Sequence, residues 1–329
     1  TMALNNKIMK LINTSKALII LTCCFMSFSA DAQVIINEYS CSNISGYTDN
    51  YGNREDWVEL YNTTGAAIDL TGYYLSDKPS DPLKWPVPSG SIPANGFKMV
   101  IASKRDAVNG AELHPNFNLK QTQGEWIILS NTFGNVVDSI KIVNMTKANH
   151  SCGRSTNAAV DWKLFTTPTP NANNVGAQQW YEPKPTMSVA PGFYAGAQLV
   201  TLLCSNPLAT IRYTTNGSDP TAASTAYTVP INIAATTVLR AAAFGANQQS
   251  FTETNTYFIN VTHTVPVVSV CSDGVYNLIA NGQQFAPANK IGAFELFDSL
   301  AFKDEGEGHF NKHGNDSWSY AQRGFDFIM

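Results

Sequence analysis

The sequence predicts an all-β fold made of tandem β-sandwich modules. Short runs of β-branched or alternating apolar residues are separated by Gly, Pro, Asn and Asp, the pattern of strands joined by tight turns. After residue 32, no stretch sustains the i, i+3, i+4, i+7 apolar spacing of an amphipathic helix. Charged residues make up only 14% of the chain, whereas an average soluble protein has about 25%. Uncharged Asn, Thr, Ser and Gly therefore supply much of the polar surface.

Length and charge limit the classes of partner. The 329 residues allow two or three domains at about 100–200 residues each. A net charge of −4 without clustered Lys and Arg argues against a nucleic-acid partner. After residue 32, no apolar run approaches the roughly 20 residues that cross a bilayer, so we expect no transmembrane span there.

Residues 1–32 are expected to be a signal peptide. Three lysines precede the apolar run 17–28, and Ala30-Asp31-Ala32 provides the small residues of a cleavage site. A lipoprotein signal at Cys23 is the alternative, but Thr22 precedes it where lipidated chains usually have Gly, Ala or Ser. We therefore expect a protein that is secreted or on the outer cell surface.

Four cysteines lie outside this segment, in a compartment where disulfides persist. Cys41 and Cys152 are the plausible bridge, whereas Cys204 and Cys271 have no evident partner. Free Cys is also among the most buried residue types, so each of the four can instead be a small apolar core residue. The chain has no CxxC motif, so a structural zinc site has little support.

Expected strands fall into three groups, and composition changes separate them. The break at Thr166–Asn174, rich in Pro and Asn, ends the first domain, and a semi-rigid linker follows at 175–182. Asn216-Gly217 predicts a tight type I′ hairpin in the second group. The third group is near the lower size limit for independent folding, so we expect its domain to continue beyond Met329. The strands are expected at Val34–Tyr39, Trp57–Tyr61, Lys98–Ala102, Trp126–Ser130 and Val136–Ile142; at Gln198–Cys204, Thr210–Thr215, Ile231–Ile233, Thr237–Phe244 and Thr254–Ile259; and at Val265–Val270, Lys290–Phe297 and Phe325–Ile328.

The first group, residues 33–174, resembles a lamin-tail domain. The resemblance is carried by Asp56-Trp-Val-Glu-Leu-Tyr-Asn62, by the span Ile68–Asp77, and by Lys84-Trp85 followed by Ile92-Pro-Ala-Asn-Gly96. Pro168-Thr-Pro170-Asn closes the domain as it does in bacterial members. The resemblance implies an immunoglobulin-like β-sandwich, whereas strand spacing alone indicates only all-β structure.

The second group, residues 183–260, looks like the chitobiase/β-hexosaminidase C-terminal domain, which is also described as fibronectin type III-associated. Its signature is Ala209-Thr-Ile-Arg-Tyr-Thr-Thr-Asn-Gly-Ser-Asp-Pro220, with Pro191-Gly-Phe-Tyr194 before it and Thr237–Ala243 after it. In that family the module is an accessory β-sandwich beside glycan-active domains. The resemblance therefore implies a non-catalytic, fibronectin-like fold.

Residues 261–329 resemble the start of a CotH-like kinase domain, on Val265–Val270, Ala293–Asp298 and His313–Phe325. The resemblance implies an incomplete α+β segment whose catalytic core lies beyond residue 329. Arg323 stands near the phosphate-facing Lys of many relatives, and ATP and Mg²⁺ follow only if the domain is completed. The order of the three modules is similar to that of large secreted proteins of Bacteroidota.

An oxygen-rich loop is a candidate calcium site. Asp49, Asn53, Glu55 and Asp56 offer the hard oxygen ligands that Ca²⁺ prefers, although their spacing departs from the EF-hand. Such residues are more often turn formers and solvated charges, with Asp56 or Glu59 accepting hydrogen bonds from backbone amides.

Trp180 and Tyr181, in the expected linker, are the candidates for stacking on a glycan, because an amphipathic ring can present a flat face to a sugar. The chain shows no complete active site. The sequence therefore predicts a secreted or cell-surface scaffold and adhesion protein whose partners are extracellular glycans or surface proteins. The alternative is the N-terminal part of a secreted CotH-like protein kinase.

Overall fold

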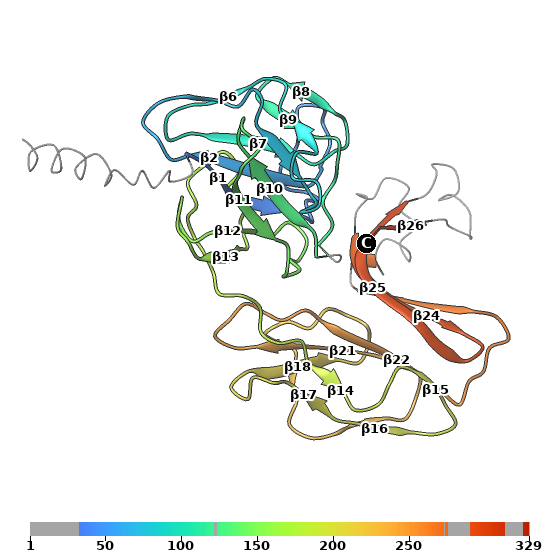
Figure 1. Cartoon of the computed structure of the whole chain (residues 1–329). Helices are drawn as coiled ribbons and strands as arrows, with labels where there is room; N and C mark the ends of the chain where they lie inside the picture. Colours follow the sequence, from blue (N-terminus) through green and yellow to red (C-terminus); the bar gives the residue numbers. More distant parts are fainter. Residues whose placement is uncertain (1–32, 122–123, 273, 276–289, 313–324, 329) are drawn as a thin grey trace, which may run out of the picture.

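The computed structural model describes residues 33–121, 124–272, 274–275, 290–312 and 325–328. Strands make up nearly all of the regular structure, in three successive assemblies along the chain (Figure 1). The expected signal peptide lies outside the described residues. In the part of the chain that is described, no helix is long and apolar enough to cross a membrane.

The first module is a sandwich of two antiparallel-rich sheets, a seven-stranded one in the order β13-β12-β1-β2-β7-β9-β8 and a four-stranded one in the order β11-β10-β4-β5. A short pair, β3-β6, accompanies them. The seven-stranded sheet contains β1 (Val34–Ser40), β2 (Trp57–Asn62), β7 (Phe97–Ile101), β8 (Ala107–Asn109), β9 (Glu112–His114), β12 (Ser151–Arg154) and β13 (Trp162–Phe165). The others are β3 (Ile68–Asp69), β4 (Tyr74–Ser76), β5 (Trp85–Pro86), β6 (Ser91–Ile92), β10 (Trp126–Ser130) and β11 (Val136–Lys141).

Alternation along β2 places residues on two buried faces of its sheet. Val58 and Leu60 join the main core between the sheets. Trp57 points to the opposite, outer face and packs in a separate small cluster with Met99 and Ile101. Because successive side chains of a strand point to opposite faces, Glu59 also belongs to the outer face. That outer face is therefore covered by other parts of the chain.

A bulge in β1 sets which residues face outward. The pairing of β1 with β2 shifts between Ile36 and Glu38, so that Glu38 lies opposite Glu59. A bulge inserts one extra residue and re-aims the side chains that follow it. Two carboxylates thus come to lie opposite each other on the outer face.

The second module has a five-stranded sheet in the order β15-β22-β21-β18-β19, with two-stranded sheets β16-β20 and β14-β17. Its core contains Val200, Leu239, Ala241 and Tyr257. The small residues of β21 and the aromatic ring of Tyr257 allow close packing between the sheets. The strands are β14 (Thr186–Met187), β15 (Gly192–Tyr194), β16 (Gln198–Val200), β17 (Leu202–Leu203), β18 (Thr210–Thr214), β19 (Thr225–Ala226), β20 (Ile231–Ile233), β21 (Thr237–Phe244) and β22 (Glu253–Ile259).

The predicted tight hairpin at Asn216-Gly217 is wrong. A type I′ turn needs positive φ at both central residues, and of these two only Gly217 has it, at 78°. The Asn216 side chain instead accepts hydrogen bonds from the Ser218 backbone and hydroxyl. Gly217 donates its backbone N–H to Val238 on β21, so the turn is held against the sheet.

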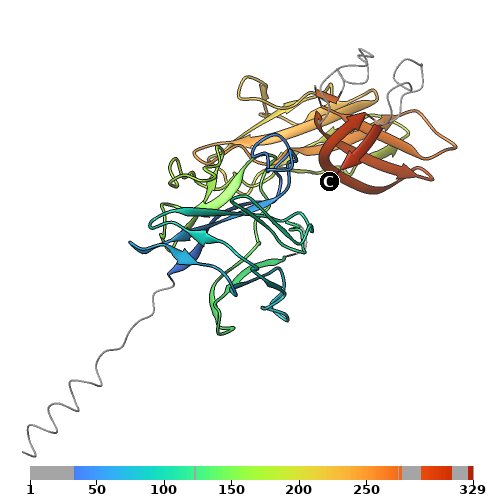
Figure 2. The same cartoon turned by 90° about the horizontal axis from the view of Figure 1, so that it is seen from above.

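The last part of the chain forms one antiparallel sheet in the order β23-β24-β25-β26. The expected α+β segment is therefore not supported, because the described residues of 261–329 form β-structure almost throughout. Figure 2 shows this sheet beside the second module. Its strands are β23 (Val267–Cys271), β24 (Lys290–Asp298), β25 (Ala301–Lys312) and β26 (Phe325–Ile328).

All four described cysteines are free thiols, so the expected bridge between Cys41 and Cys152 is absent from the structure. Cys152 lies on β12 opposite Tyr39, and it is buried in the main core against which Cys41 packs. Burial raises the pKa values of both thiols, which keeps them protonated. The two residues serve here as small apolar core residues, the alternative interpretation of the sequence.

Candidate functional site

The outer face of the seven-stranded sheet is covered by the closing segment, defined as residues 166–174. Glu38, which is fully buried, holds this segment to β1. One Glu38 carboxylate oxygen accepts a hydrogen bond from the Thr169 hydroxyl at 2.6 Å, and the other accepts from the Thr169 backbone N–H at 3.1 Å. The Ser151 hydroxyl on β12 donates to the same carboxylate. Glu38 thus joins two strands and the closing segment.

Glu59 makes the matching contacts one strand away. Its carboxylate accepts a hydrogen bond from the Asn171 backbone N–H at 2.6 Å and another from the Asn37 side chain at 3.0 Å. Asn37 also donates to Asn174 Oδ1 at 2.9 Å, and Asn174 donates to the Arg154 backbone carbonyl at 2.7 Å. This network confirms the prediction that Glu59 accepts hydrogen bonds from backbone amides.

Burial controls the charge of the two carboxylates. Desolvation raises the pKa of Glu59 to about 8, and the nearby Glu38 carboxylate adds to the rise. Burial also raises the pKa of Glu38, against the lowering effect of its hydrogen bonds to Ser151 and Thr169. The oxygen of the Asn37 amide is buried without a hydrogen-bond partner. The network therefore has too few donors for two full negative charges.

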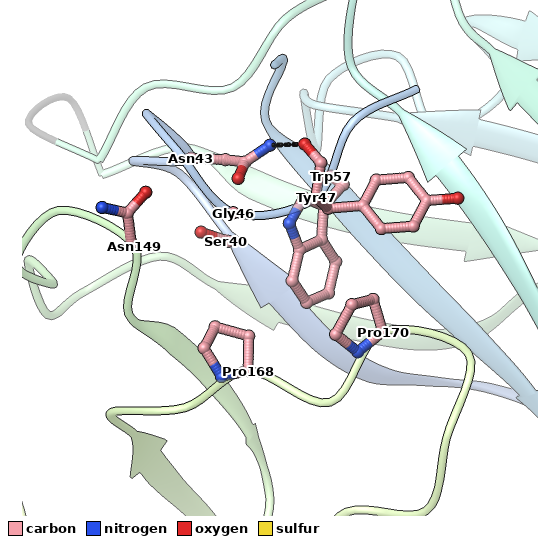
Figure 3. A pocket seen from close by; sticks show the side chains of 8 residues that line it. All are labelled: Ser40, Asn43, Gly46, Tyr47, Trp57, Asn149, Pro168 and Pro170. Atoms are coloured by element: carbon pink, nitrogen blue, oxygen red, sulfur yellow. Dashed lines mark hydrogen bonds between the residues drawn. The ribbon is translucent and has the colours of Figure 1, made fainter. Parts of the chain in front are cut away.

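A pocket of about 290 Å³ lies beside this network (Figure 3). Figure 3 shows Trp57 on one side, Pro168 and Pro170 of the closing segment below it, and Asn149 across from it. The pocket is lined by Ser40, Asn43, Gly46, Tyr47, Trp57, Asn149, Pro168 and Pro170.

Hydrogen bonds fix the loop that forms the upper wall of the pocket. Asn43 Nδ2 donates to the Tyr47 carbonyl at 2.7 Å, and Asn149 Oδ1 accepts from the backbone N–H groups of Ile44 and Ser45 at 2.9 and 2.6 Å. The Tyr47 hydroxyl points away from the pocket and donates to Glu112 at 2.7 Å (Figure 3). The wall is thus preformed, as small-molecule sites usually are.

The sequence alone does not reveal this pocket, because its walls come from distant segments. The sequence marks Trp57 only as part of a strand motif, and Pro168 and Pro170 only as a domain end. The one signal in the sequence is the pair Glu38 and Glu59, acidic residues within strands that are otherwise apolar. Buried carboxylates require donors, and these donors are backbone amides of the closing segment.

The structure separates the predicted calcium ligands into different local contacts. Asp49 Oδ1 accepts the backbone N–H groups of Tyr51 and Asn53 at 3.0 and 2.7 Å, an arrangement that shapes the turn. Glu55 pairs with Arg105 at 3.7 Å. Burial raises the pKa of Asp56 to about 7. Among the described residues, no three His, Cys, Asp or Glu side chains gather where they could hold a metal ion.

Trp180 and Tyr181 lie between the first two modules. Trp180 packs against the core of the first module. The Tyr181 hydroxyl accepts the Lys147 backbone N–H at 2.9 Å and lies 2.7 Å from His150 Nδ1. Its ring stacks on His150 and meets Phe251 of the second module edge to face. Glycan stacking by this pair stays a prediction. In the structure, Tyr181 already contacts both modules: Lys147 and His150 of the first and Phe251 of the second.

Backbone contacts continue across the same junction. Gln178 donates its N–H to the Leu164 carbonyl on β13 at 2.8 Å. Glu182 donates to the Gln248 carbonyl at 2.7 Å, and Gln248 donates to the Trp180 carbonyl at 3.2 Å. The segment expected as a linker, 175–182, is thus bonded to both modules.

Arg323, the predicted phosphate contact, lies outside the described residues. The described strands β23–β26 carry no observation that favours phosphoryl transfer. The kinase interpretation of this part of the chain stays a prediction.

The comparisons match two segments of the chain. Residues 27–144 match the family model of the Lamin Tail Domain, and residues 189–256 match that of the Chitobiase/beta-hexosaminidase C-terminal domain. No curated protein and no solved structure gives a significant match. The first match ends before β12, β13 and the closing segment, which complete the seven-stranded sheet and the pocket. The chain is therefore similar, in order, to a lamin tail domain and a chitobiase/β-hexosaminidase C-terminal domain.

Proposed function

We propose that this protein is a secreted or cell-surface scaffold that contacts extracellular glycans or surface proteins through non-catalytic β-sandwich modules. Two observations support the non-catalytic part: the two family matches and the nearly all-β structure. Export is an expectation from the features of residues 1–32.

The junction around Tyr181 carries the proposal. Interfaces between domains usually permit relative motion unless the contact is extensive. Here Tyr181 supplies a hydrogen-bonded hydroxyl to one module and a ring contact to the other. Lys147 adds its ammonium over the rings of Tyr181 and Phe251, at 5.5 and 5.8 Å from their centroids. Such a junction suits a spacer that holds its modules at a set distance and angle.

The third sheet is joined to the second module by a buried carboxylate. Glu295 on β24 accepts the Thr256 backbone N–H at 3.0 Å as well as the Thr256 hydroxyl. Phe297 meets the ring of Phe258 edge to face with centroids 5.2 Å apart. These contacts join the C-terminal sheet to the second module, as the Tyr181 contacts join the first module to the second.

Adhesion of the full chain tests the proposal. Beads coated with the purified protein are expected to be retained on immobilised extracellular glycans or surface proteins, and protease treatment of intact cells is expected to remove the protein. Beads coated with an unrelated β-sandwich protein are the control. A protein that survives protease treatment of intact cells, or beads that are retained no better than the control, would contradict the proposal.

A further inference from the structure

The face of the third sheet that packs on the second module carries two glutamates side by side. Glu295 and Phe297 are two positions apart on β24, so their side chains share one face. Phe297 meets the rings of Phe193 and Phe258 in the second module, which identifies this face as the packed one (Figure 2). Glu305 on β25 is the register partner of Glu295, so both carboxylates lie on this face as direct neighbours.

Glu295 is sealed inside the contact and can be satisfied there without a charge. It is 1% exposed, and one of its carboxylate oxygens accepts the Thr256 backbone N–H at 3.0 Å. The other oxygen contacts the Thr256 hydroxyl, which lies 2.7 Å from the Ser269 hydroxyl. A protonated carboxyl can accept the N–H at one oxygen and donate from the other to the Thr256 hydroxyl. No hydrogen bond is therefore lost when Glu295 is neutral.

Two cations of the second module border this contact, and both already have carboxylate partners. Lys184 pairs with Glu253 of β22. Arg240, which is 1% exposed, pairs with Asp219 and lies 3.8 Å from Glu307 of β25. In the described part of the chain, neither cation forms an ion pair with the two neighbouring glutamates of the third sheet.

The surroundings of the glutamate pair disfavour its charge. Burial raises the pKa of Glu295 to about 7, and the charges of Glu305 and Glu253 add to the rise. Burial also raises the pKa of Glu305; Lys184 offsets part of this effect, whereas Glu253 and Asp304 increase it. Two ionised carboxylates would thus repel each other in a contact that holds too few cations for both.

The other titratable groups beside the glutamate pair do not compensate for its charge. Burial raises the pKa of Tyr257 to about 12 and that of Cys271 to about 11, so both stay neutral. Burial raises the pKa of Glu307 as well, against the lowering effect of Arg240 and of Lys147 from the first module. These two cations therefore act on Glu307.

A pocket of about 390 Å³ opens beside the same contact and decides which glutamate ionises last. Glu305 lines this pocket and is exposed, so water can hydrate its charge. Glu295 does not line it and stays sealed until the sheet moves away. The walls of the pocket come from all three parts of the chain: Met145; Lys184, Phe251, Thr252 and Thr254; and Ala293, Phe294, Glu305, Gly306 and Glu307.

We infer that this contact is a pH-sensitive switch, in which the third sheet is docked on the second module while Glu295 is protonated and is released when Glu295 ionises beside Glu305. In the released state Glu295 is hydrated and regains ordinary acidity, so its ionisation favours release. The docked state has the raised pKa, so docking is favoured at low pH and is lost as pH rises through about 7. The switch goes beyond the proposed scaffold and does not depend on any contact with glycans.

Hydrogen exchange of the Thr256 amide in the full chain tests the switch, because the acceptor of this N–H is Glu295 on the third sheet. After correction for the intrinsic effect of pH on exchange, its protection is expected to fall about 30-fold between pH 5.5 and 8, as a pKa rise from 4.5 to about 7 requires. Amides in the middle of β21 are the internal reference and should keep their protection. Carbon-13 NMR of the Glu295 carboxyl should show a midpoint near 7.

Two variants separate the switch from a merely structural contact. Glu295→Gln accepts the Thr256 N–H and donates to the Thr256 hydroxyl as the protonated acid does, so its protection should stay high at pH 8. Glu305→Gln removes the neighbouring charge and should lower the midpoint of Glu295. Asp298→Asn, at the exposed end of the same strand, is the control and should behave as the parent. Amide spectra show whether each variant is folded.

Three results would overturn the inference. A Glu295 carboxyl that titrates near the ordinary glutamate value would show that the contact does not disfavour its charge. An unchanged pH dependence in Glu295→Gln would assign the effect to another group. An equal loss of protection in β21 would show that the whole second module opens, rather than that the sheet is released. All of these measurements use the chain without a partner, so their failure leaves the proposed adhesion to be judged by its own test.

Discussion

Glu38 and Glu59 lie opposite each other on neighbouring strands, and both are fully buried. Like charges directly opposite on a sheet are destabilising unless donors or protons compensate for them. Here the compensating donors include backbone amides of the closing segment, at Thr169 and Asn171. The pair therefore couples the stability of the sheet to the placement of the segment that forms the pocket.

Stability should fall as pH rises, because burial raises the pKa of Glu59 to about 8. An acid with a raised folded-state pKa stabilises the fold fully below its unfolded pKa and loses that contribution as pH rises through the folded value. Between the ordinary glutamate pKa of 4.5 and the raised value of about 8, the expected loss of stability is on the order of 5 kcal/mol. Urea unfolding at successive pH values measures it.

Glu59→Gln removes this titration, so its stability should change less between pH 5 and 9 than that of the parent. Glu55→Gln is the matched control, because Glu55 is only partly buried and pairs with Arg105. An equal pH dependence in the Glu59→Gln variant and the parent would show that Glu59 does not control it.

Gly153 on β12 should tolerate no side chain. A Cβ there would lie 3.0 Å from Glu38 Cγ, Asn174 Nδ2 and Phe165 Cε2 at once. Gly153→Ala is therefore expected to destabilise the fold by about 1–3 kcal/mol, the usual cost of overpacking. Gly65→Ala, with no atom within 4 Å of its added Cβ, is the control. Equal melting temperatures for the two variants would contradict the packing described for the closing segment.

Removing the Tyr181 hydroxyl should loosen the junction between modules without unfolding either one. Tyr181→Phe loses the contacts with the Lys147 N–H and His150 Nδ1 but keeps the ring against Phe251. We expect faster protease cleavage in 175–182 and a loss of about 1–3 kcal/mol, the size of two hydrogen bonds. Tyr74→Phe, in β4, serves as the control. An unchanged cleavage rate in the Tyr181 variant would show that the hydroxyl does not hold the junction together.

The contact between Thr256 and Glu295 should hold the third sheet to the second module. Thr256→Val keeps the shape of the side chain but removes the hydroxyl that donates to Glu295. Hydrogen exchange of β23 and β24 amides is expected to speed up, while exchange in the first sandwich stays unchanged. Ser299→Ala, at an exposed turn, is the control. Equal exchange in β23 and β24 of the parent and the Thr256 variant would contradict this role.

Strand positions could be predicted because they depend on local sequence. The structure confirms the expected strands at 34–39, 57–61 and 237–244 to within one residue at each end. Alternation and turn residues are properties of neighbouring positions, so a single sequence reports them.

The pocket could not be predicted because it depends on contacts between distant residues. Thr169 is bound by Glu38, 131 positions earlier in the chain. The Pro- and Asn-rich composition of residues 166–174 indicates only a domain end. Composition does not reveal which buried carboxylates accept hydrogen bonds from the backbone amides of this segment. The linker at 175–182 was likewise expected to be only a spacer, and its bonds to both modules come from residues far apart in sequence.

The most direct test of the scaffold is the relative orientation of the first two modules in solution. Residual dipolar couplings of backbone amides in β1–β13 and in β14–β22 report on that orientation. We expect one alignment tensor to fit both modules together. Two tensors of clearly different magnitude would show that the modules move independently, and that result would contradict the scaffold.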